Sequence, residues 1–364
     1  MVIDKIFLTN FRNYESLELT LNPKVNIFIG KNAAGKTNIL ESIYFLAITK
    51  SHRLINDINM ITNNELFSKV KSEIIKADQK LTLEILLNEQ GKTYKINKVE
   101  EKKVSNYISN LMCLIFTPDD LEIIKGSPAV RRRFLNIEIG QISKSYLKNL
   151  NKYNYVLKLR NEYLKNSNKD AAYLEILTDK LIEYGVSIVL ERQNFINKIN
   201  GSIDIIFENV TLSNGLRIEY KPSIPLSDNG IELSAIFKNK FKNIKKRELL
   251  LKNTLIGPHR DDFLFYLGAK ELNEYGSQGQ QRMAIIALKL SEIKIFKDVT
   301  NEYPVVLLDD ILSELDIEKR TNLLNCIDKD IQVIITTTDL KNIKRNKIRN
   351  ATIYEVENGK VREN

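Results

Sequence analysis

The feature that most constrains this chain is a glycine-rich segment, residues 30–37, that matches the pattern G-x-x-x-x-G-K-[ST] in full. An apolar run, residues 25–29, precedes it, and residues 37–47 follow with apolar side chains at helical spacing. A buried strand that leads through such a loop to a helix N-terminus surrounds a phosphate with backbone N–H groups. An ordinary glycine turn, the alternative, does not require the fixed positions of the pattern. We therefore predict that the chain binds a nucleoside triphosphate.

The residue types within this segment indicate its chemistry. The predicted phosphate-binding residues are Gly30, Lys31, Asn32, Ala33, Ala34, Gly35, Lys36 and Thr37. In loops of this kind the lysine reaches the β- and γ-phosphates, and the hydroxyl group ligates Mg²⁺. We assign the catalytic role to Lys36 and the metal-ligating role to Thr37.

A second apolar run, residues 305–308, ends in two adjacent carboxylates, Asp309 and Asp310. A phosphate loop needs a carboxylate that helps to hold Mg²⁺, and the end of a buried strand is a suitable place for it. We predict that Asp309 coordinates the metal, directly or through water, and that Asp310 polarises the attacking water as the catalytic base. A strand that merely ends in an acidic turn is the alternative, and the phosphate loop disfavours it.

The composition is that of a globular protein with a sizeable core. Of the 364 residues, 43% are hydrophobic and 28% are charged. No run is long and apolar enough to span a membrane, and the N-terminus lacks a secretory apolar core, so we expect a cytoplasmic protein without a membrane partner. Cys113 and Cys326 are expected to be buried free thiols. His52 and His259 lack metal-like spacing and are expected to make structural or phosphate-adjacent hydrogen bonds.

The net charge of +9 is concentrated in one third of the chain, because residues 131–250 hold 21 Lys and Arg against 13 Asp and Glu. Such clusters bind nucleic acids by releasing counterions from the phosphate backbone. A polyanion such as a nucleic acid is therefore the predicted partner, and the charge alone leaves open whether it is duplex, gapped or single-stranded. The alternatives are a merely solvated basic surface and, for the arginine cluster, internal salt bridges. The candidate DNA contacts are Arg131, Arg132, Arg133, Lys245, Lys246 and Arg247.

The periodicity of the apolar residues changes twice along the chain. Strand-like alternation dominates the first part, with a hairpin predicted at residues 81–96. Residues 147–200 instead carry apolar side chains at intervals of three and four, which predicts long amphipathic helices. Strand–helix–strand alternation returns at residues 303–335, as in a parallel sheet. We predict an α/β head, residues 1–125 and 251–364, split by a mainly helical basic arm, residues 126–250.

A second anion site is predicted where an apolar helix begins near residue 283. A serine hydroxyl, a glycine amide and a helix N-terminus are offered together by Ser277, Gln278, Gly279 and Gln280. This segment resembles the signature motif of ABC-type ATPases, which contacts the γ-phosphate of ATP bound to the opposite subunit. Residues 313–316 resemble the D-loop of the same superfamily. The ordered set of motifs predicts a P-loop ABC-type ATPase head with mixed sheets and helices.

The large insertion between the phosphate loop and the signature motif resembles the structural-maintenance-of-chromosomes (SMC) class of DNA-associated ATPases. Further segments resemble the RecF family of bacterial recombination mediators, namely residues 6–14, 51–53, 126–135 and 257–262. These segments cover both ends of the chain and the insertion, so the resemblance spans essentially the whole sequence.

This resemblance implies a function. Members of the RecF family are cytoplasmic DNA-binding ATPases that dimerise around ATP and act in gap repair, replication-fork maintenance and the SOS response. Their partners are RecR, RecO and, downstream, RecA, which they help to load. For this chain the resemblance implies ATP and Mg²⁺ as cofactors and an ATP-dependent homodimer that forms a clamp on DNA.

The resemblance also assigns roles to individual residues. Arg12 joins the nucleotide-binding residues, and the signature residues 277–280 act in trans. Thr338 occupies a switch position at which many ABC-type ATPases have histidine, and Asp310 stands where many have glutamate. The shorter carboxylate lies farther from the attacking water, and threonine cannot donate an imidazole N–H to the γ-phosphate. We therefore expect weak, DNA-stimulated ATP hydrolysis.

Three other functions are compatible with a phosphate loop. An ABC transporter ATPase subunit is disfavoured by the basic insertion and by the RecF-like segments. A metabolite kinase does not need a signature motif. A DNA-binding module that uses ATP only to set its dimer state remains open, and replacement of Asp310 would distinguish it from a cycling enzyme.

Overall fold

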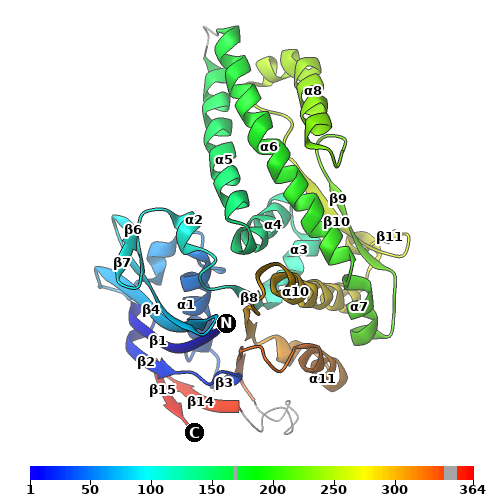
Figure 1. Cartoon of the computed structure of the whole chain (residues 1–364). Coiled ribbons are helices and arrows are strands. Elements are labelled where there is room, and N and C mark those ends of the chain that lie inside the picture. The colour runs from blue at the N-terminus through cyan, green and yellow to red at the C-terminus, as the bar shows by residue number, and fades with distance from the viewer. Residues whose placement is uncertain (167–169, 340–350) are drawn as a thin grey trace. The chain divides into compact units, whose positions relative to one another are not determined.

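The computed structural model describes residues 1–166, 170–339 and 351–364. The contacts within the chain, whose ribbon is drawn in Figure 1, divide it into two compact units. Unit 1 consists of Met1–Asp120, Ile205–Ser213 and Met283–Asn364. Unit 2 consists of Leu121–Asp204 and Asn214–Arg282.

These units differ from the division predicted from the sequence in two long segments and in residues 121–125, which cluster with unit 2 rather than with the head. Ile205–Ser213 clusters with unit 1, and residues 251–282 cluster with unit 2 although the sequence assigned them to the head. The second difference arises from strand pairing, because β10 (Asp262–Leu267) lies antiparallel to β9 (Leu216–Lys221). Periodicity reports local structure only, so it could not reveal this long-range pairing.

Unit 1 contains a six-stranded sheet that is largely parallel. Strand β3 pairs in parallel with β13 and β14, and β12 pairs in parallel with β13 and β8. The carboxyl ends of β3, β8, β12 and β13 therefore share one edge, which is where open α/β sheets bind their ligands. The order across the sheet is β15 (Lys360–Glu363), β14 (Ala351–Glu357), β3 (Val25–Ile29), β13 (Val333–Thr337), β12 (Val305–Asp309) and β8 (Cys113–Phe116).

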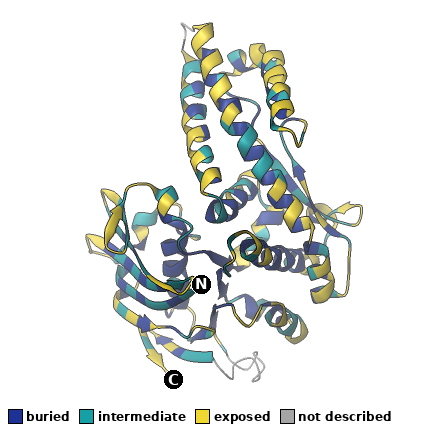
Figure 2. Cartoon of the chain, in the orientation of Figure 1, coloured by how far each residue is buried: buried dark blue, intermediate teal, exposed yellow. Residues whose placement is uncertain are grey.

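A second six-stranded sheet in unit 1 is antiparallel, and helix α1 (Lys36–Ile48) contacts both sheets. Figure 2 shows α1 almost entirely in the colour of buried residues. The sequence predicted a single apolar face for this helix, whereas its contacts with both sheets also bury Glu41 and Ser42. The order across the antiparallel sheet is β2 (Tyr14–Thr20), β1 (Val2–Phe11), β4 (Phe67–Lys76), β5 (Gln79–Asn88), β6 (Gly91–Ile96) and β7 (Val99–Glu101).

The β5–β6 pairing confirms the hairpin predicted at residues 81–96. Cys113 is buried in β8 as predicted, but Cys326 is exposed at the end of α11, so the prediction for Cys326 was wrong. The remaining elements of unit 1 are η1 (Asp57–Met60), α2 (Val104–Tyr107), η2 (Pro118–Leu121), η3 (Ile311–Glu314) and α11 (Ile317–Cys326). The division between the units falls at the end of η2 and within two helices, α7 (Ile203–Thr211) and α10 (Gln278–Thr300).

Unit 2 is mainly helical, and α6 (Ala171–Asn200) contacts α5 (Lys144–Lys165), α8 (Gly230–Leu251) and strand β9. The ion pair between Arg160 of α5 and Glu248 of α8 is buried, with a separation of 2.6 Å between Nη2 and Oε2. None of the helices in the described part of the chain is long and apolar enough to cross a membrane. The helices are α3 (Glu122–Lys125), α4 (Pro128–Ile142), α5 (Lys144–Lys165), α6 (Ala171–Asn200), α8 (Gly230–Leu251) and α9 (Leu272–Tyr275), and β11 (Lys270–Glu271) completes a three-stranded sheet with β9 and β10.

Candidate nucleotide-binding site

The phosphate loop joins the carboxyl end of β3 to the first turn of α1. Gly35 has a φ of 115°, a conformation that side chains with a Cβ rarely adopt. A Cβ atom at this position would lie 2.5 Å from Asn13 Nδ2 and 2.7 Å from the hydroxyl of Tyr14. The turn between β1 and β2 thus packs against the loop, and Tyr14 donates a hydrogen bond of 3.1 Å to the carbonyl oxygen of Gly35.

Lys36 lies within the loop, and its side chain is buried. Its ammonium group donates hydrogen bonds to the carbonyl oxygens of Gly30 at 2.6 Å and of Lys31 at 2.9 Å. Burial lowers the pKa of Lys36, while the carboxylates of Asp310 and Asp309 act in the opposite direction. The loop, the lysine and both carboxylates therefore lie together, as the motifs predicted.

Thr37 and Asp309 are in direct contact. The Thr37 hydroxyl donates a hydrogen bond of 2.8 Å to Asp309 Oδ1, and the Thr336 hydroxyl donates another of 2.8 Å to the same atom. A hydroxyl and a carboxylate side by side are hard oxygen ligands, and Mg²⁺ is commonly bound by one or two such groups together with water and phosphate oxygens. The residues present therefore fit a magnesium ion.

Asp310 follows Asp309 at the edge of the sheet and has a φ of 52°. Its backbone N–H donates a hydrogen bond of 3.0 Å to Thr336 Oγ1. Its Oδ1 atom is sheltered from solvent and has no hydrogen-bond partner within the part of the chain that is described. A sheltered carboxylate oxygen beside Thr37 and Asp309 is available as an acceptor, which is what a group that polarises water requires.

Sequence reasoning missed two residues that hold Arg12 beside the loop. Arg12 forms a bidentate ion pair with Glu41 of α1, with Nε and Nη2 each 2.8 Å from a carboxylate oxygen. Ser51 donates a hydrogen bond of 2.5 Å to the same carboxylate. Burial alone would raise the pKa of Glu41, but the hydrogen bonds from Arg12 and Ser51 outweigh it and lower the pKa. The available signal was Glu41 as the one acidic residue of a mostly apolar helix.

We expect Glu41→Gln to lower the free energy of unfolding by about 2 kcal/mol at neutral pH, because Arg12 then loses its partner charge. The folded-state pKa of Glu41 lies below its ordinary value of 4.5. The ionised carboxylate therefore stabilises the fold above pH 4.5, and this contribution is lost as the pH falls through the folded-state pKa. Urea unfolding at neutral and acidic pH should show that the difference from wild type shrinks on acidification. A pH-independent difference would contradict the ion-pair explanation, and exposed Glu18→Gln is the matched control.

The C-terminal hairpin β14–β15 contributes to the surroundings of the phosphate loop. A pocket of about 490 Å³ is lined by residues 29–34 of the loop and by residues 355–358 of the hairpin. The backbone N–H of Gly359 donates a hydrogen bond of 3.3 Å to the carbonyl oxygen of Ala34. No sequence motif marks this hairpin, so its role beside the loop was not predicted.

The signature segment belongs to unit 2, whereas the phosphate loop belongs to unit 1. The Ser277 N–H donates to Gln280 Oε1 at 2.9 Å, and the Gln280 N–H donates to Ser277 Oγ at 3.2 Å. This reciprocal pair is a capping box at the start of α10. Ser277, Gln278, Gly279 and Gln280 are all exposed.

Thr338 directly follows β13, at the same edge of the sheet as Asp309, and is exposed. Its neighbour Thr337 donates a hydrogen bond of 3.0 Å to the carbonyl oxygen of Asp339. The position at the end of β13 is compatible with a switch residue.

The structure corrects the assignment of Arg131 as a DNA contact. This side chain is buried, and its Nε and Nη2 atoms lie 2.6 and 2.9 Å from the carboxylate oxygens of Asp262. A third donor, Nη1, bonds the Gly126 carbonyl oxygen at 2.7 Å. Arg131 therefore makes the internal salt bridge that was its alternative. Arg132 is half-buried and Arg133 is exposed.

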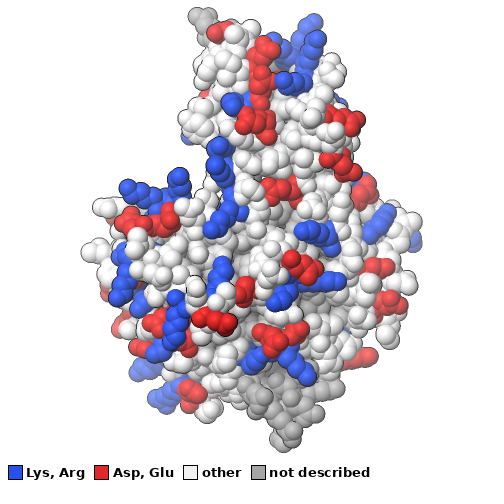
Figure 3. Space-filling view, in the orientation of Figure 1, with Lys and Arg blue, Asp and Glu red and all other residues white. Residues whose placement is uncertain are grey.

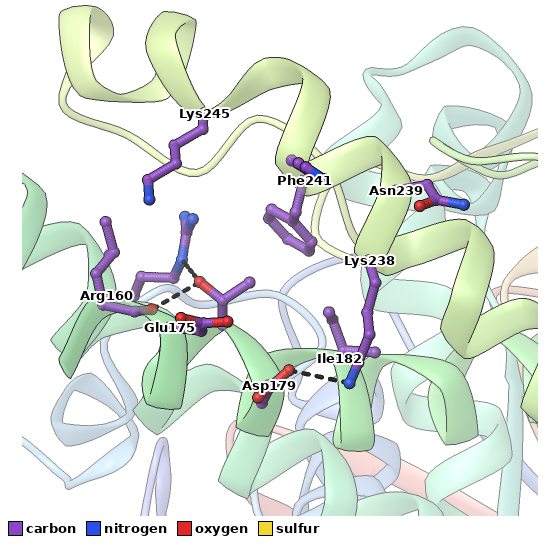
Figure 4. Close-up of a pocket in the computed structure, with 11 residues that line it drawn as sticks. Arg160, Glu175, Asp179, Ile182, Lys238, Asn239, Phe241 and Lys245 are labelled. Carbon is purple, nitrogen blue, oxygen red and sulfur yellow. Dashed lines mark hydrogen bonds and ion pairs between the residues drawn. The ribbon is translucent and has the colours of Figure 1, made fainter. Parts of the chain in front are cut away.

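Lys245, Lys246 and Arg247 are exposed on α8, as a DNA contact requires. Lys245 extends over a pocket of about 440 Å³ between α6 and α8, where Lys238 pairs with Asp179 at 3.4 Å (Figure 4). The space-filling view in Figure 3 shows Lys and Arg side chains gathered over the end of α8, with Asp and Glu side chains nearby. Charge on the visible face is thus mixed rather than uniformly basic.

Comparisons with known proteins converge on one family. A family model described as the RecF/RecN/SMC N-terminal domain matches residues 2–362. A Listeria innocua protein named DNA replication and repair protein RecF is 43% identical, with 100% of both chains covered. A Bacillus cereus protein of the same name is 42% identical over 99% of this chain and 98% of its own.

Solved structures agree. A structure described as the recombination mediator protein RecF-ATP in the RecFOR pathway has a TM-score of 0.92 and 31% identity, and the match covers 100% of this chain and 97% of that chain. An SMC head bound to the C-winged helix domain of ScpA has a TM-score of 0.55 at 15% identity, covers 100% of this chain and 98% of that chain, and indicates a shared fold alone.

Proposed function

The chain belongs to the RecF family, and on that premise we propose that it is an ATP-dependent DNA-binding protein whose dimer closes on DNA with bound ATP and opens after slow hydrolysis. The observation that carries the proposal is the contact between Thr37 and Asp309. It joins the phosphate loop to the acidic end of β12, which is the arrangement that a triphosphate with its metal requires.

In the proposed mechanism, backbone N–H groups of residues 30–37 surround the phosphates and Lys36 neutralises charge on the β- and γ-phosphates. Thr37 and Asp309 would hold Mg²⁺, which supplies charge neutralisation at the phosphate oxygens when bound. Arg12, fixed by Glu41, is a further cation of the nucleotide site. Asp310 accepts a hydrogen bond from the attacking water and so orients it.

Hydrolysis by this set of groups is slow. Asp310 is one methylene shorter than glutamate, and Thr338 offers a hydroxyl rather than an imidazole N–H to the γ-phosphate. Stimulation by DNA would follow if DNA binding stabilised the closed dimer, because the in-trans groups are in place only there.

The signature segment is proposed to complete the site of a second copy of the chain. Ser277 and Gly279 are exposed at the N-terminus of α10, and the capping box fixes the conformation of this turn. A helix N-terminus with an exposed serine whose O–H can still donate is complementary to a γ-phosphate. ATP would therefore hold two heads together, and loss of the γ-phosphate would release them.

DNA contacts are proposed for those predicted cations of unit 2 that are exposed or half-buried. The set now consists of Arg132, Arg133, Lys245, Lys246 and Arg247, without Arg131. Lysine and arginine side chains read the phosphate backbone, so these residues would support binding without sequence preference.

The biological role is proposed from the family. The relatives are named for DNA replication and repair, and a solved relative belongs to the RecFOR pathway. We propose that this chain acts in the cytoplasm with RecO and RecR in gap repair, replication-fork maintenance and SOS induction, and that it helps to load RecA.

The proposed function predicts an ATP-specific dimer that retains DNA. Sedimentation would be measured with Mg²⁺ and ATP, ADP or no nucleotide, in the presence of labelled gapped duplex DNA. We expect a DNA-bound dimer with ATP alone, and we expect Ser277→Arg to abolish it because the long cation blocks the approach of the γ-phosphate. Ser16→Arg, at an exposed position on β2, adds the same charge elsewhere and serves as the control.

A monomer under every condition would contradict the in-trans role of Ser277 and the clamp. A dimer that forms equally with ADP would contradict the dependence on the γ-phosphate. Loss of the dimer in Ser16→Arg as well would mean that added charge, rather than the signature segment, is responsible.

A further inference from the structure

The loop after α1 holds a histidine in an unusual position. Ser51 fixes this loop, since its hydroxyl accepts hydrogen bonds from the backbone N–H groups of Arg53 at 3.0 Å and Leu54 at 2.9 Å while donating to buried Glu41. His52 therefore has a defined orientation. Its ring lies edge-on to Tyr44, with 5.3 Å between the centroids and an angle of 79°.

Both ring nitrogens of His52 are sheltered from solvent, and neither has a hydrogen-bond partner among residues 1–166, 170–339 and 351–364. Leaving a donor and an acceptor buried without partners is unfavourable, and native proteins rarely do so unless another group satisfies them. If packing against Tyr44 were the only role of this side chain, an apolar ring would serve as well.

The charges around His52 indicate which kind of group could form hydrogen bonds with its ring nitrogens. Burial lowers its pKa most strongly, with opposing effects from the carboxylates of Glu41, Asp309 and Asp119 and an additional lowering by Arg53. The imidazole is therefore neutral at neutral pH and offers one N–H and one lone pair.

Two of those carboxylates, Asp309 and Asp119, lie at the edge of the sheet where Thr37 contacts Asp309. Asp119 follows β8, which pairs with β12 so that Phe116 lies opposite Leu308, directly before Asp309. Glu41 lies one turn along α1 from Thr37. His52 is thus held among acceptor groups on the side of the loop where Thr37 meets Asp309.

We propose that His52 is a positioning residue that orients water in the hydration shell of the bound metal and γ-phosphate, between Asp309 and Asp119. A water molecule of this shell can donate a hydrogen bond to the lone pair of the imidazole. This inference rests on the proposed function, since it requires that Mg²⁺ and ATP bind at the loop. It adds to the site an imidazole that does not come from the switch position, where the chain has Thr338.

The chain contains only two histidines, so imidazole ¹⁵N signals can be observed selectively, with His259→Gln to assign them. Nucleotide binding would be measured in parallel by calorimetry with Mg²⁺ and a slowly hydrolysed ATP analogue, and with the analogue alone. We expect the His52 signals to shift on binding with Mg²⁺, and less without it. The chemical shifts of His259 should not change, because this ring is hydrogen-bonded to Tyr153 in unit 2.

Two outcomes of this experiment distinguish a failure of the inference from a failure of the proposed function on which it rests. If calorimetry detects no binding, the proposed function fails. If the analogue binds with Mg²⁺ and the His52 signals stay in place, the function stands and the inference is overturned.

A variant provides an independent readout. His52→Phe keeps a ring against Tyr44 and removes both nitrogens, so we expect the unfolding temperature and ATP affinity to change little and the hydrolysis rate to fall about tenfold or more. Ile55→Ala, in the same loop with a fully exposed side chain, should behave as wild type. An unchanged rate in folded His52→Phe would overturn the inference. Should His52→Phe not fold, the imidazole signals of the wild-type protein decide the question.

Discussion

Replacing Lys36 with Ala is expected to lower the rate of ATP hydrolysis by about 100- to 1,000-fold and to weaken ATP binding, because no other group provides a charge at its position in the loop. The ammonium group lies within hydrogen-bond distance of two loop carbonyl oxygens and close to Asp309 and Asp310. Charge stabilisation in a sheltered site is stronger than in water, so its loss is costly. Steady-state hydrolysis and calorimetric binding of ATP would measure both effects.

The fold should survive this change, because the printed hydrogen bonds of the Lys36 ammonium group are to carbonyl oxygens of its own loop and alanine favours helices. Lys50→Ala, at an exposed position just after α1, removes the same charge and should retain wild-type activity. Hydrolysis within about threefold of wild type in Lys36→Ala would exclude the loop as the catalytic site.

Asp310→Asn is expected to lower the hydrolysis rate by about 100-fold or more while leaving ATP binding and the ATP-dependent dimer intact. Asparagine has nearly the same shape but cannot accept as strongly from the attacking water. It also tolerates the left-handed φ of 52° at this position, so the strand end should keep its conformation. Hydrolysis under single-turnover conditions, together with sedimentation in ATP, would separate the chemical step from assembly.

This variant also distinguishes the two remaining functions. A cycling enzyme with Asn at position 310 should bind DNA as a dimer and fail to release it. A binding module that uses ATP only for dimerisation should release DNA as the wild-type protein does. Asp316→Asn, at an exposed position of the segment that resembles a D-loop, is a comparison that removes a carboxylate other than Asp309 and Asp310.

Much of the site could be predicted because its residues are close together in sequence or end consecutive strands of one sheet. Residues 30–37 form a single loop, and their roles follow from glycine conformations and from the strand–loop–helix context. The meeting of Thr37 with Asp309 follows from topology, since β3 and β12 both pair with β13 in parallel and place their carboxyl ends at one edge. The RecF resemblance is confirmed by 43% identity to a relative over the full chain.

The supporting residues could not be predicted because their partners are distant in the chain. In the sequence, Glu41 is one polar residue of a mostly apolar helix. No neighbouring residue indicated that Arg12 and Ser51 both bond to it. The sequence places Arg131 in a basic cluster, whereas the structure pairs it with Asp262. A charge run has the same composition whether it faces solvent or a buried carboxylate.

The sequence by itself determined the family, the phosphate loop, the acidic strand end and the alternation of strand and helix, because each depends on spacing over a few residues or on matching motifs. Only the tertiary structure decided which charges are available. It paired Arg131 with Asp262, fixed Arg12 through Glu41, and left both nitrogens of His52 without a partner among the described residues. The physical reason is that burial and pairing are set by contacts between distant segments, whereas local pattern reports only propensity and periodicity.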